Sequence, residues 1–281
     1  MNPRIVFLDV DGTLINYHTI MPQSAGRAVT QAMKNGHRVY LCTGDSRYEL
    51  GHRKLMETDG LILGNGAYVE DHGNVILHQT ISAQDERAIV DWCSERQLGY
   101  VLECNSGMYC NSWMKKKGPD AMYRYGTGKG KDPEAARQSA SGYVGIMQEV
   151  HGNDQYRDDV NKISFVLDHY QDHLDSKAMF PDLVAGTWGG KDEMALFGDL
   201  SPKGISKKHG IQVLLDYLKA SREDTIAFGD AKIDIPMFEA CAYSVAMGNA
   251  GEECKAAADY VTDDVDNDGL AKAFRHLGLI D

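Results

Sequence analysis

The sequence predicts an α/β protein in which a parallel-sheet domain is interrupted by an inserted α+β domain. Short, continuous apolar runs alternate with helical patterns in residues 1–81, and the same alternation returns in residues 191–281. Residues 82–190 carry hairpin signals as well as helices. Apolar strands without polar alternation are typical of a parallel sheet that helices cover on both faces. We therefore expect one discontinuous core domain and one insert, rather than two domains in series.

The first core segment shows the order β-α-β-α-β. The apolar run at 4–8 ends at Asp9, and Gly36 stops the helical pattern that begins at Pro22. Because helices join its consecutive strands, the strands are expected to be parallel neighbours. The expected elements are strands at 4–8, 38–42 and 61–63 and helices at 22–35 and 46–57.

The second core segment repeats this style after residue 200. Ser201 and Pro202 fit the N-cap and the first position of a helix. A strand at 225–228 then leads into Gly229. The expected elements are helices at 202–218, 235–240, 251–257 and 269–276 and strands at 225–228, 243–247 and 259–261.

The insert has a different pattern. Ser82 and Asp85 resemble a capping box at a helix start, and Asn105-Ser-Gly107 is a hairpin signal between two strands. The polar stretch 115–132, rich in Gly and Lys, is expected to be a loop. Beyond it we expect a helix at 134–150, a strand at 162–167, a helix at 170–180 and strands at 183–188 and 193–197.

Composition and charge restrict the function. The chain has 281 residues, of which 43% are hydrophobic, so disorder of the whole chain is excluded. Its 29 Lys and Arg against 41 Asp and Glu give a net charge of −12, so general binding to nucleic acid or to anionic membranes is not expected. No apolar run approaches the about 20 residues of a membrane span. The six cysteines lack zinc-site spacing, and we expect a cytoplasmic protein with free thiols.

The first candidate site is Asp9-Val-Asp11-Gly12, directly after the strand at 4–8. Carboxylates at i and i+2 point to the same side of the chain, and ligands of open α/β sheets bind at the carboxyl ends of the strands. Two like charges this close repel each other unless a cation or a raised pKa relieves them. The alternative is an ordinary Asp-Gly turn with solvated carboxylates.

Two further groups are suited to binding an oxyanion. Thr43-Gly44 follows the strand at 38–42, and the hydroxyl can either donate to a phosphate or cap a helix. Lys203 falls in the first turn of the expected helix at 202–218, where the helix dipole disfavours a cation. A bound anion would compensate, because helix starts and lysine both attract phosphate. The alternative is a solvated lysine.

The fourth group, Asp230 and Asp234, follows the strand at 225–228. Residues four apart share a face once a helix begins, so the two carboxylates can meet one cation. The alternative is an acidic helix start that the helix dipole favours. Four such groups at the ends of one sheet weaken the alternatives, and carboxylates beside a substrate phosphate suit Mg²⁺.

This combination of motifs resembles the haloacid dehalogenase-like superfamily of phosphatases. Further motifs resemble its Cof-type branch, which carries a large C2-type (IIB) cap. The core motifs are Asp9-Val-Asp11-Gly-Thr13, Thr43-Gly44, Lys203 and Gly229-Asp230-x-x-x-Asp234. The further motifs are Asn65-Gly66-Ala67, Ser201-Pro-Lys-Gly-Ile-Ser206, Ala246-Met-Gly-Asn-Ala250 and Asp268-Gly269.

The resemblance implies a Rossmann-like core that carries a Mg²⁺-dependent phosphoryl-transfer site. Asp9 is implied as the nucleophile that becomes an aspartyl-phosphate. Asp11 is implied as the acid that protonates the leaving oxygen and then activates water.

The resemblance also implies which residues bind phosphate and metal. Thr43 and Lys203 are implied to hold the transferring phosphoryl oxygens and to offset their charge. Gly12, Gly44 and Asn249 are the further residues of the phosphate site. The implied metal ligands are Asp9, the backbone carbonyl of Asp11, Asp230 and Asp234.

The chain departs from the family pattern at two places. Asp45 follows Thr-Gly where the family often has Arg, and Arg47 comes two residues later. Ile233 precedes Asp234 where the family often has Asn, and Lys232 adds a charge. These residues would support the site rather than carry the reaction, so they bear on turnover and metal geometry.

The insert is implied to act as a cap that closes over the site and selects the leaving group. Residues 103–111 and 188–192 are the candidates for this selection. Lys115, Lys116, Lys117 and Arg124 form a local basic patch. The patch is either a solvated run of lysines or a surface that steers a phosphorylated substrate.

The predicted function is that of a Mg²⁺-dependent phosphatase acting on a small phosphorylated metabolite, such as a sugar phosphate. One alternative is a sugar phosphomutase with the same capped fold. The other is a binding or regulatory member of the family with weakened catalysis. Nothing in the sequence indicates an oligomeric state.

Overall fold

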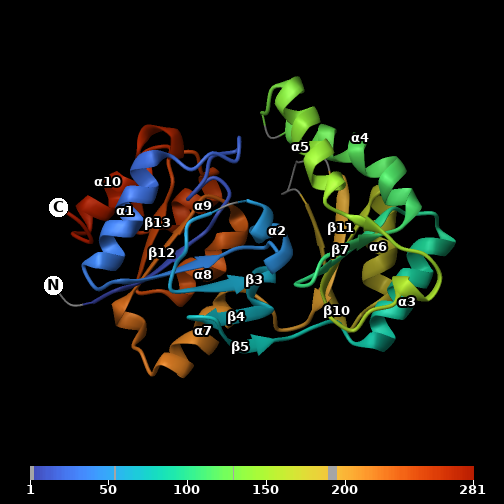
Figure 1. Cartoon of the computed structure of the whole chain (residues 1–281), viewed down its shortest axis with the longest axis horizontal. Coiled ribbons are helices and arrows are strands. Elements are labelled where there is room, and N and C mark those ends of the chain that lie inside the picture. The colour runs from blue at the N-terminus through green and yellow to red at the C-terminus, as the bar shows by residue number, and fades with distance from the viewer. Residues whose placement is uncertain (1–2, 54, 129, 189–194) are drawn as a thin grey trace. The chain divides into compact units, whose positions relative to one another are not determined.

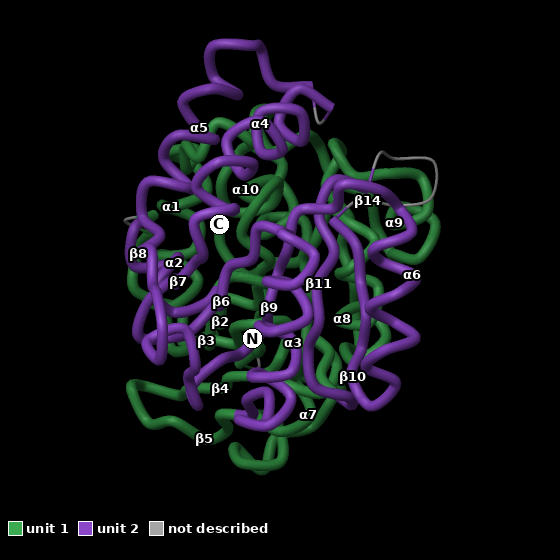
Figure 2. Tube along the Cα trace, turned by 90° about the vertical axis from the view of Figure 1, so that its right-hand side faces the viewer, with its two compact units in different colours: residues 1–45, 53–78, 205–281 green, residues 46–52, 79–204 purple. Residues whose placement is uncertain are grey.

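The computed structural model describes residues 3–53, 55–128, 130–188 and 195–281 (Figure 1). The chain forms two compact units, each with its own sheet (Figure 2). Unit 1 comprises residues 1–45, 53–78 and 205–281. Unit 2 comprises residues 46–52 and 79–204.

Unit 1 is built on an eight-stranded sheet in the order β14-β13-β12-β1-β2-β3-β4-β5. Strand β1 lies inside the sheet and pairs in parallel with both β2 and β12. Strands β4 and β5 add an antiparallel edge that was not predicted. The bounds are β1 Ile5–Leu8, β2 Arg38–Cys42, β3 Gly60–Leu63, β4 Tyr68–Asp71, β5 Asn74–His78, β12 Thr225–Gly229, β13 Tyr243–Ala246 and β14 Tyr260–Val261.

Helices cover both faces of this sheet, as the continuous apolar strands predicted (Figure 1). Helices α1 (Gln23–Lys34) and α10 (Gly269–His276) pack together on one face. There the Phe274 ring lies 5.1 Å from that of Phe228 on β12. On the other face, α7 (Lys207–Leu218), α8 (Ile235–Ala240) and α9 (Glu252–Ala257) bury apolar side chains against β1, β2 and β12.

The predicted start of the helix after residue 200 is wrong. Ser201 and Pro202 end strand β11 (Phe197–Pro202), which pairs with β9 and β10 in unit 2. Helix α7 instead begins at Lys207, and the Ser206 hydroxyl caps it by accepting a hydrogen bond from the backbone of His209. Both serines fit a cap, and only the sheet pairing of β11 distinguishes them.

The boundaries of the insert differ from the predicted ones for the same reason. Strand β11 hydrogen-bonds to strands of the insert, so unit 2 ends at residue 204 and not at 190. Residues 46–52, which contain helix α2 (Arg47–His52), also group with unit 2 by their contacts.

Unit 2 contains a six-stranded sheet in the order β10-β11-β9-β6-β7-β8. Helices α3 (Ala83–Glu95) and α6 (Tyr170–Met179) cover one face of it, and Trp92 of α3 packs edge-on against Phe165. Ser82 caps α3, as predicted, by accepting from the backbone of Asp85. The remaining strands are β6 Tyr100–Cys104, β7 Met108–Cys110, β8 Gln148–Glu149, β9 Val160–Val166 and β10 Leu183–Thr187.

The stretch 115–132, expected to be a loop, mostly forms helix α4 (Ser112–Gly128). It packs along α5 (Pro133–Gly145). A Cβ atom on Gly126 would lie 3.2 Å from the Cβ of Ala136, so the glycine lets the two helices approach closely. Gly118 and Gly126 are therefore packing residues, and tertiary contact overrides their low helix propensity, whereas a Cβ atom on Gly128 or Gly130 would meet nothing within 4 Å.

All six cysteines are buried and free, as expected. Among the described residues, no helix is both long enough and apolar enough to cross a membrane.

Candidate active site

Asp9 stands at the carboxyl end of β1, where its backbone N–H extends the sheet by donating to the Phe228 carbonyl at 3.0 Å. The Asp9 side chain is 10% exposed. Burial, followed by the nearby carboxylate of Asp234, raises the pKa of Asp9 well above its ordinary value, although Lys207 opposes this. Asp9 is thus a buried carboxylate in an acidic environment that needs cationic partners.

Lys207, in the first turn of α7, is the cation that reaches Asp9. Its Nζ lies 2.6 Å from Asp9 Oδ1 and 2.6 Å from Asp234 Oδ1. Burial alone would lower the pKa of Lys207, but Asp234 and Asp9 overcome this and raise it well above its ordinary value. A lysine that is 1% exposed therefore carries its charge between two carboxylates.

Asp234 holds the loop after β12 in place. Its Oδ2 accepts from the backbone N–H groups of Asp230 at 3.0 Å and of Ala231 at 2.9 Å. Gly229 is required here, because a Cβ atom on it would lie 2.5 Å from the Cβ of Asp234. Both oxygens of Asp234 are thus engaged by donors of the chain itself.

Asp9, Asp230 and Asp234 form a group that fits a divalent cation. One carboxylate oxygen from each lies within 4.8 Å of the others, and all three side chains are buried. Burial and the charge of Asp234 raise the pKa of Asp230 to about 7. Three carboxylates with one lysine leave excess negative charge, and hard carboxylate oxygens are the donors that Mg²⁺ prefers.

A tight turn follows Asp9 and brings the backbone against Asp230. Gly12 adopts φ +81°, and a Cβ atom on it would lie 2.3 Å from the Asp230 carboxylate. The Asn249 amide donates to the Gly12 carbonyl at 2.8 Å and accepts from the backbone of Val265 at 2.9 Å. Asn249 therefore uses both ends of its side chain to hold this turn.

The Asp11 carboxylate does not belong to the three-carboxylate group. It lies 2.5 Å from Arg53 Nη1, and its side chain is 41% exposed. An exposed carboxylate that an arginine holds beside a buried one is suited to exchanging protons with a substrate and water.

Thr43 directly follows β2 and is 3% exposed. Its hydroxyl oxygen accepts from the backbone N–H of Asp45 at 3.2 Å, and its carbonyl accepts from Asn65 at 3.0 Å. A Cβ atom on Gly44 would lie 3.1 Å from Asn65 Oδ1, a buried oxygen with no hydrogen-bond partner in the part of the chain that the structure describes. This amide is therefore available to a bound polar group.

The structure brings Lys207, and not the predicted Lys203, to Asp9. Lys203 belongs to unit 2, its side chain is 58% exposed, and its nearest carboxylate is that of Asp182 at 3.6 Å. Lys207, four residues further on, meets Asp9 and Asp234. Ser206 offered a second possible cap, and starting the helix there would have placed Lys207 in its first turn.

Sequence reasoning also missed Tyr17 and Arg53. The Tyr17 hydroxyl donates a hydrogen bond to Asp230, and Arg53 contacts Asp11. No local pattern marks either residue, because both come from loops whose approach to the site depends on tertiary structure.

The departures Lys232 and Ile233 face away from the carboxylates. Lys232 pairs with Glu253 at 2.9 Å, and both side chains are 63% exposed. Ile233 is 53% exposed. Neither residue therefore adds charge to the site or buries an apolar group in it.

Unit 2 has a polar cluster of its own on one face of its sheet. Glu103 and Lys162 are cross-strand partners with a 2.9 Å ion pair, and Ser164 donates to Glu103 at 2.5 Å. Asp199 stands opposite Ser164, and burial raises its pKa above the ordinary value. Of the candidate specificity residues at 188–192, only Trp188 lies within the described residues, and its ring is 5.5 Å from Lys162 Nζ.

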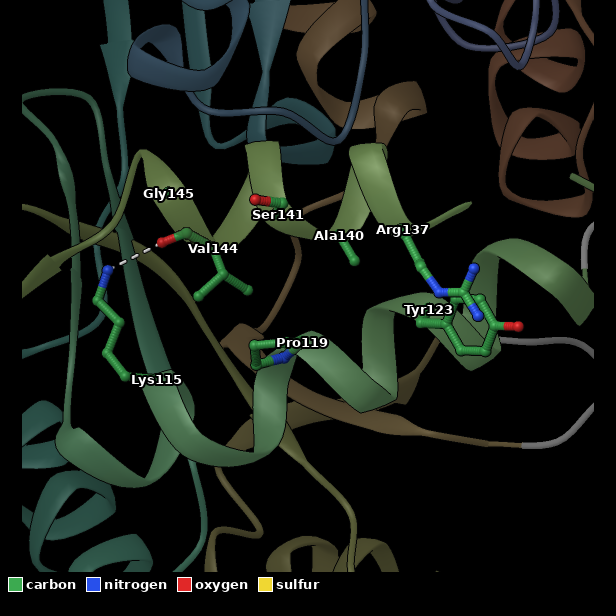
Figure 3. Close-up of a pocket in the computed structure, with 8 residues that line it drawn as sticks. All are labelled: Lys115, Pro119, Tyr123, Arg137, Ala140, Ser141, Val144 and Gly145. Carbon is green, nitrogen blue, oxygen red and sulfur yellow. Dashed lines mark hydrogen bonds between the residues drawn. The ribbon is translucent and has the colours of Figure 1, made fainter. Parts of the chain in front are cut away.

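The basic patch is largely engaged in structural contacts. Lys115 lines a hollow of about 330 Å³ between α4 and α5 (Figure 3). Its Nζ donates to the carbonyls of Val144 at 2.9 Å and of Met147 at 2.7 Å. Lys117 pairs with Asp168 at 2.6 Å. Lys116 lies over the Trp113 ring at 5.1 Å. These contacts favour the interpretation of the patch as a structural surface.

Comparison with known proteins shows the family of the chain. The model of the haloacid dehalogenase-like hydrolase family matches residues 6–274, and the chain belongs to this family. The chain is 38% identical to the 5-amino-6-(5-phospho-D-ribitylamino)uracil phosphatase YcsE of Bacillus subtilis (strain 168), over 98% of this chain and 96% of that protein.

Solved structures give the same class. The subclass IIB sugar phosphatase BT4131 matches with a TM-score of 0.76 and 26% identity, covering 99% of this chain and 100% of that one. The phosphatase BT1666 from Bacteroides thetaiotaomicron matches with a TM-score of 0.77 and 30% identity, covering 99% and 96%. The protein is thus a haloacid dehalogenase-like phosphatase of the Cof type, which confirms the predicted class of enzyme.

Proposed function

We propose that this enzyme is a Mg²⁺-dependent phosphatase that hydrolyses a small phosphorylated metabolite through an aspartyl-phosphate. The observation that carries the proposal is the buried group of Asp9, Asp230 and Asp234 around Lys207 at the carboxyl ends of β1 and β12. A nucleophilic carboxylate, a fixed cation and a set of hard oxygen ligands are the parts that transfer of a phosphoryl group to a carboxylate requires.

In the first half of the reaction, a carboxylate oxygen of Asp9 attacks phosphorus. The bond between phosphorus and the ester oxygen breaks, and its electron pair goes to the leaving oxygen, which takes a proton from Asp11. In the second half, Asp11 accepts a proton from water as the water attacks the aspartyl-phosphate. The bond to Asp9 breaks, and phosphate is released with Asp9 restored as a carboxylate and Asp11 as the protonated acid.

In this proposal, Lys207 and Thr43 bind the phosphoryl oxygens. Lys207 lies 2.6 Å from Asp9 Oδ1, so its charge is beside the attacking group. The ordered Thr43 hydroxyl adds a donor at the end of the neighbouring strand. Because Gly12 and Gly44 have no side chains, no Cβ atom blocks the turns after β1 and β2. Asn249 holds the Gly12 turn.

Asp9, Asp230 and the backbone carbonyl of Asp11 would hold Mg²⁺, and Asp234 would orient the loop and Lys207. When bound, Mg²⁺ supplies positive charge that offsets the carboxylates and the phosphoryl oxygens. The raised pKa values of Asp9 and Asp230 support this assignment, because a cation would relieve the repulsion that raises them.

A sugar phosphate is the first substrate class to test, because the similar protein BT4131 is named a sugar phosphatase. In unit 2, Lys162 and Asp199 are partly exposed beside the buried Glu103 and Ser164 on one sheet face. A donor and an acceptor that lie close together suit the hydroxyl groups of a sugar, so Lys162 and Asp199 are the proposed selectors of the leaving group.

The test is a phosphate-release assay over a panel of phosphorylated sugars, polyols and nucleotides with Mg²⁺, run with wild type and Asp9→Asn. We expect release from at least one small ester, and a fall of at least about a thousandfold in kcat for the variant, because the nucleophile is lost. Circular dichroism should show the same fold. Substantial Mg²⁺-dependent turnover by Asp9→Asn would reject the assignment of the nucleophile, and transfer between sugar positions without phosphate release would indicate a mutase.

A further inference from the structure

Arg53 bridges two carboxylates of unit 1. Its Nε and Nη2 contact the two oxygens of Asp45 at 2.8 and 3.2 Å, and its Nη1 contacts Asp11 Oδ1 at 2.5 Å. A guanidinium group is planar with donors in fixed directions, so a two-point contact with Asp45 also fixes the direction of Nη1.

Asp45 is itself held by the backbone beside the site. Its N–H donates to the Thr43 hydroxyl oxygen at 3.2 Å, and its carbonyl accepts from Gly64 at 2.9 Å. The first contact joins it to the end of β2 and the second to the residue after β3. Through Asp45, Arg53 is thus held in place relative to the same strand ends that carry the candidate active site.

The exposed fraction of the side chain increases from Asp45 through Arg53 to Asp11. The Asp45 side chain is 13% exposed, that of Arg53 is 22% exposed, and that of Asp11 is 41% exposed. The ion pair at the Asp45 end is therefore the more shielded from solvent and the more rigid, while the Asp11 end can reach a substrate.

The pairing also accounts for the departure at residue 45. An aspartate after Thr-Gly would add a negative charge near Asp11, but Arg53 contacts both carboxylates at once. Arg53 lies eight positions beyond Asp45 in the sequence.

We propose that Arg53, held by Asp45, is a positioning residue that aims the Asp11 carboxylate at the oxygen with which it exchanges a proton. The inference rests on the proposed function, because Asp11 must be the proton donor to the leaving group. Because Arg53 acts through Asp11, Arg53 itself is not expected to bind the substrate.

The test compares two phosphomonoesters on the full-length enzyme with Mg²⁺. An alkyl phosphate needs its leaving oxygen protonated, whereas p-nitrophenyl phosphate has a good leaving group that needs much less help. Because general acid catalysis contributes about 10²–10⁴-fold, Arg53→Gln should lower kcat/KM for the alkyl ester, which reports the steps up to release of the leaving group, at least about tenfold. Its kcat/KM for the aryl ester should change by less than about threefold on the same scale. A fall in kcat common to both esters is also expected, because Asp11 accepts the proton of the attacking water in the second half of the reaction.

Three other variants complete the test. Arg53→Lys should recover only part of the lost alkyl-ester kcat/KM, because lysine lacks the fork that contacts both carboxylates. Asp45→Asn should lower activity on the alkyl ester by a smaller factor, with the same preference for the aryl ester. If Arg53→Gln does not fold, this variant tests the positioning role in its place. Arg4→Gln is the control, since Arg4 is 41% exposed and precedes β1 at the end opposite Asp9.

Equal losses of kcat/KM on the two esters, or a rise in KM without loss of kcat, would overturn the positioning role. Wild-type kcat/KM values on both esters in Arg53→Gln would overturn it as well. These failures differ from failure of the proposed function, in which wild type itself would release no phosphate or Asp9→Asn would stay active.

Discussion

Both units gather three carboxylates around one lysine, but the backbone supports the two clusters differently. In unit 1 the acids stand in loops at the carboxyl ends of strands, and backbone N–H groups fix Asp234. In unit 2 the residues lie mainly along strands, paired across the sheet. The unit 1 cluster is Asp9, Asp230, Asp234 and Lys207, and the unit 2 cluster is Glu49, Glu103, Asp199 and Lys162.

The difference in support leads to a difference in chemistry. Strand ends let successive loops converge, and the carboxylate oxygens in unit 1 come within 4.8 Å of one another. On a sheet face the spacing of neighbouring strands keeps side chains in pairs, so Glu103 is satisfied by Lys162 and Ser164. Among the described residues, the unit 1 acids are the group suited to a metal ion. The comparison indicates that a reactive site requires converging loops, whereas paired strand residues are better suited to stability and recognition.

The largest effect on activity should come from replacing Lys207, the lysine at the centre of the unit 1 cluster. Lys207→Met should lower kcat by about 10²–10³-fold, the usual effect of removing one donor that stabilises transition-state charge. Lys203→Met is the matched control four residues away, and its kcat should stay near wild type because its side chain is 58% exposed in unit 2. Steady-state kinetics on the best substrate of the panel would decide. The reverse order of effects would restore Lys203 as the phosphate-site lysine.

The corresponding change in unit 2 should act mainly on stability. Lys162→Met leaves Glu103 buried without its ion pair, and breaking such a pair costs about 3–5 kcal/mol. We expect a lower urea midpoint but a smaller loss of kcat on p-nitrophenyl phosphate than Lys207→Met shows. The double variant Lys162→Met/Glu103→Gln should regain part of the stability, because no buried charge remains unpaired. A Lys162→Met protein of wild-type stability would contradict this difference between the clusters.

A smaller effect should appear in the pH dependence of stability. The folded protein without metal raises the pKa of Asp230 and of Glu49 to about 7. A raised carboxyl pKa stabilises the folded state at low pH, and this stability is lost as pH rises from about 4 through 7. The loss is about 1.4 kcal/mol per pH unit for each proton that the folded state retains in excess. Urea titrations at pH 5.5 and 8 with EDTA would measure it.

Adding Mg²⁺ in the same experiment distinguishes the effect of the unit 1 cluster on stability from that of the unit 2 cluster. It should stabilise the protein more at pH 8 than at pH 5.5, because protons compete with the cation for the unit 1 carboxylates. Asp230→Asn should lose most of this stabilisation, and Glu49→Gln should keep it. Equal stabilisation by Mg²⁺ at both pH values would contradict the role of the unit 1 cluster as the metal site.

The sequence by itself determined the class of fold and most of the reactive groups. Apolar runs that end in Asp9, Thr43 and Gly229 predicted strands whose carboxyl ends meet at one edge of a parallel sheet. This works because each element there is short and local, and its start and stop depend on its own side chains. Hydrophobic burial then brings these strand ends together whatever the details of the loops.

The tertiary structure decided what depends on partners distant in the chain. Ser201 and Ser206 are both good helix caps, and the pairing of β11 with β10, in which Ser201 lies opposite Val184, leaves the second as the cap and brings Lys207 rather than Lys203 beside Asp9. Contact with α5 makes a helix of residues 112–128. Arg53 meets Asp11 from 42 residues away. Local propensities differ too little to select among such alternatives, and long-range packing supplies the free energy that does.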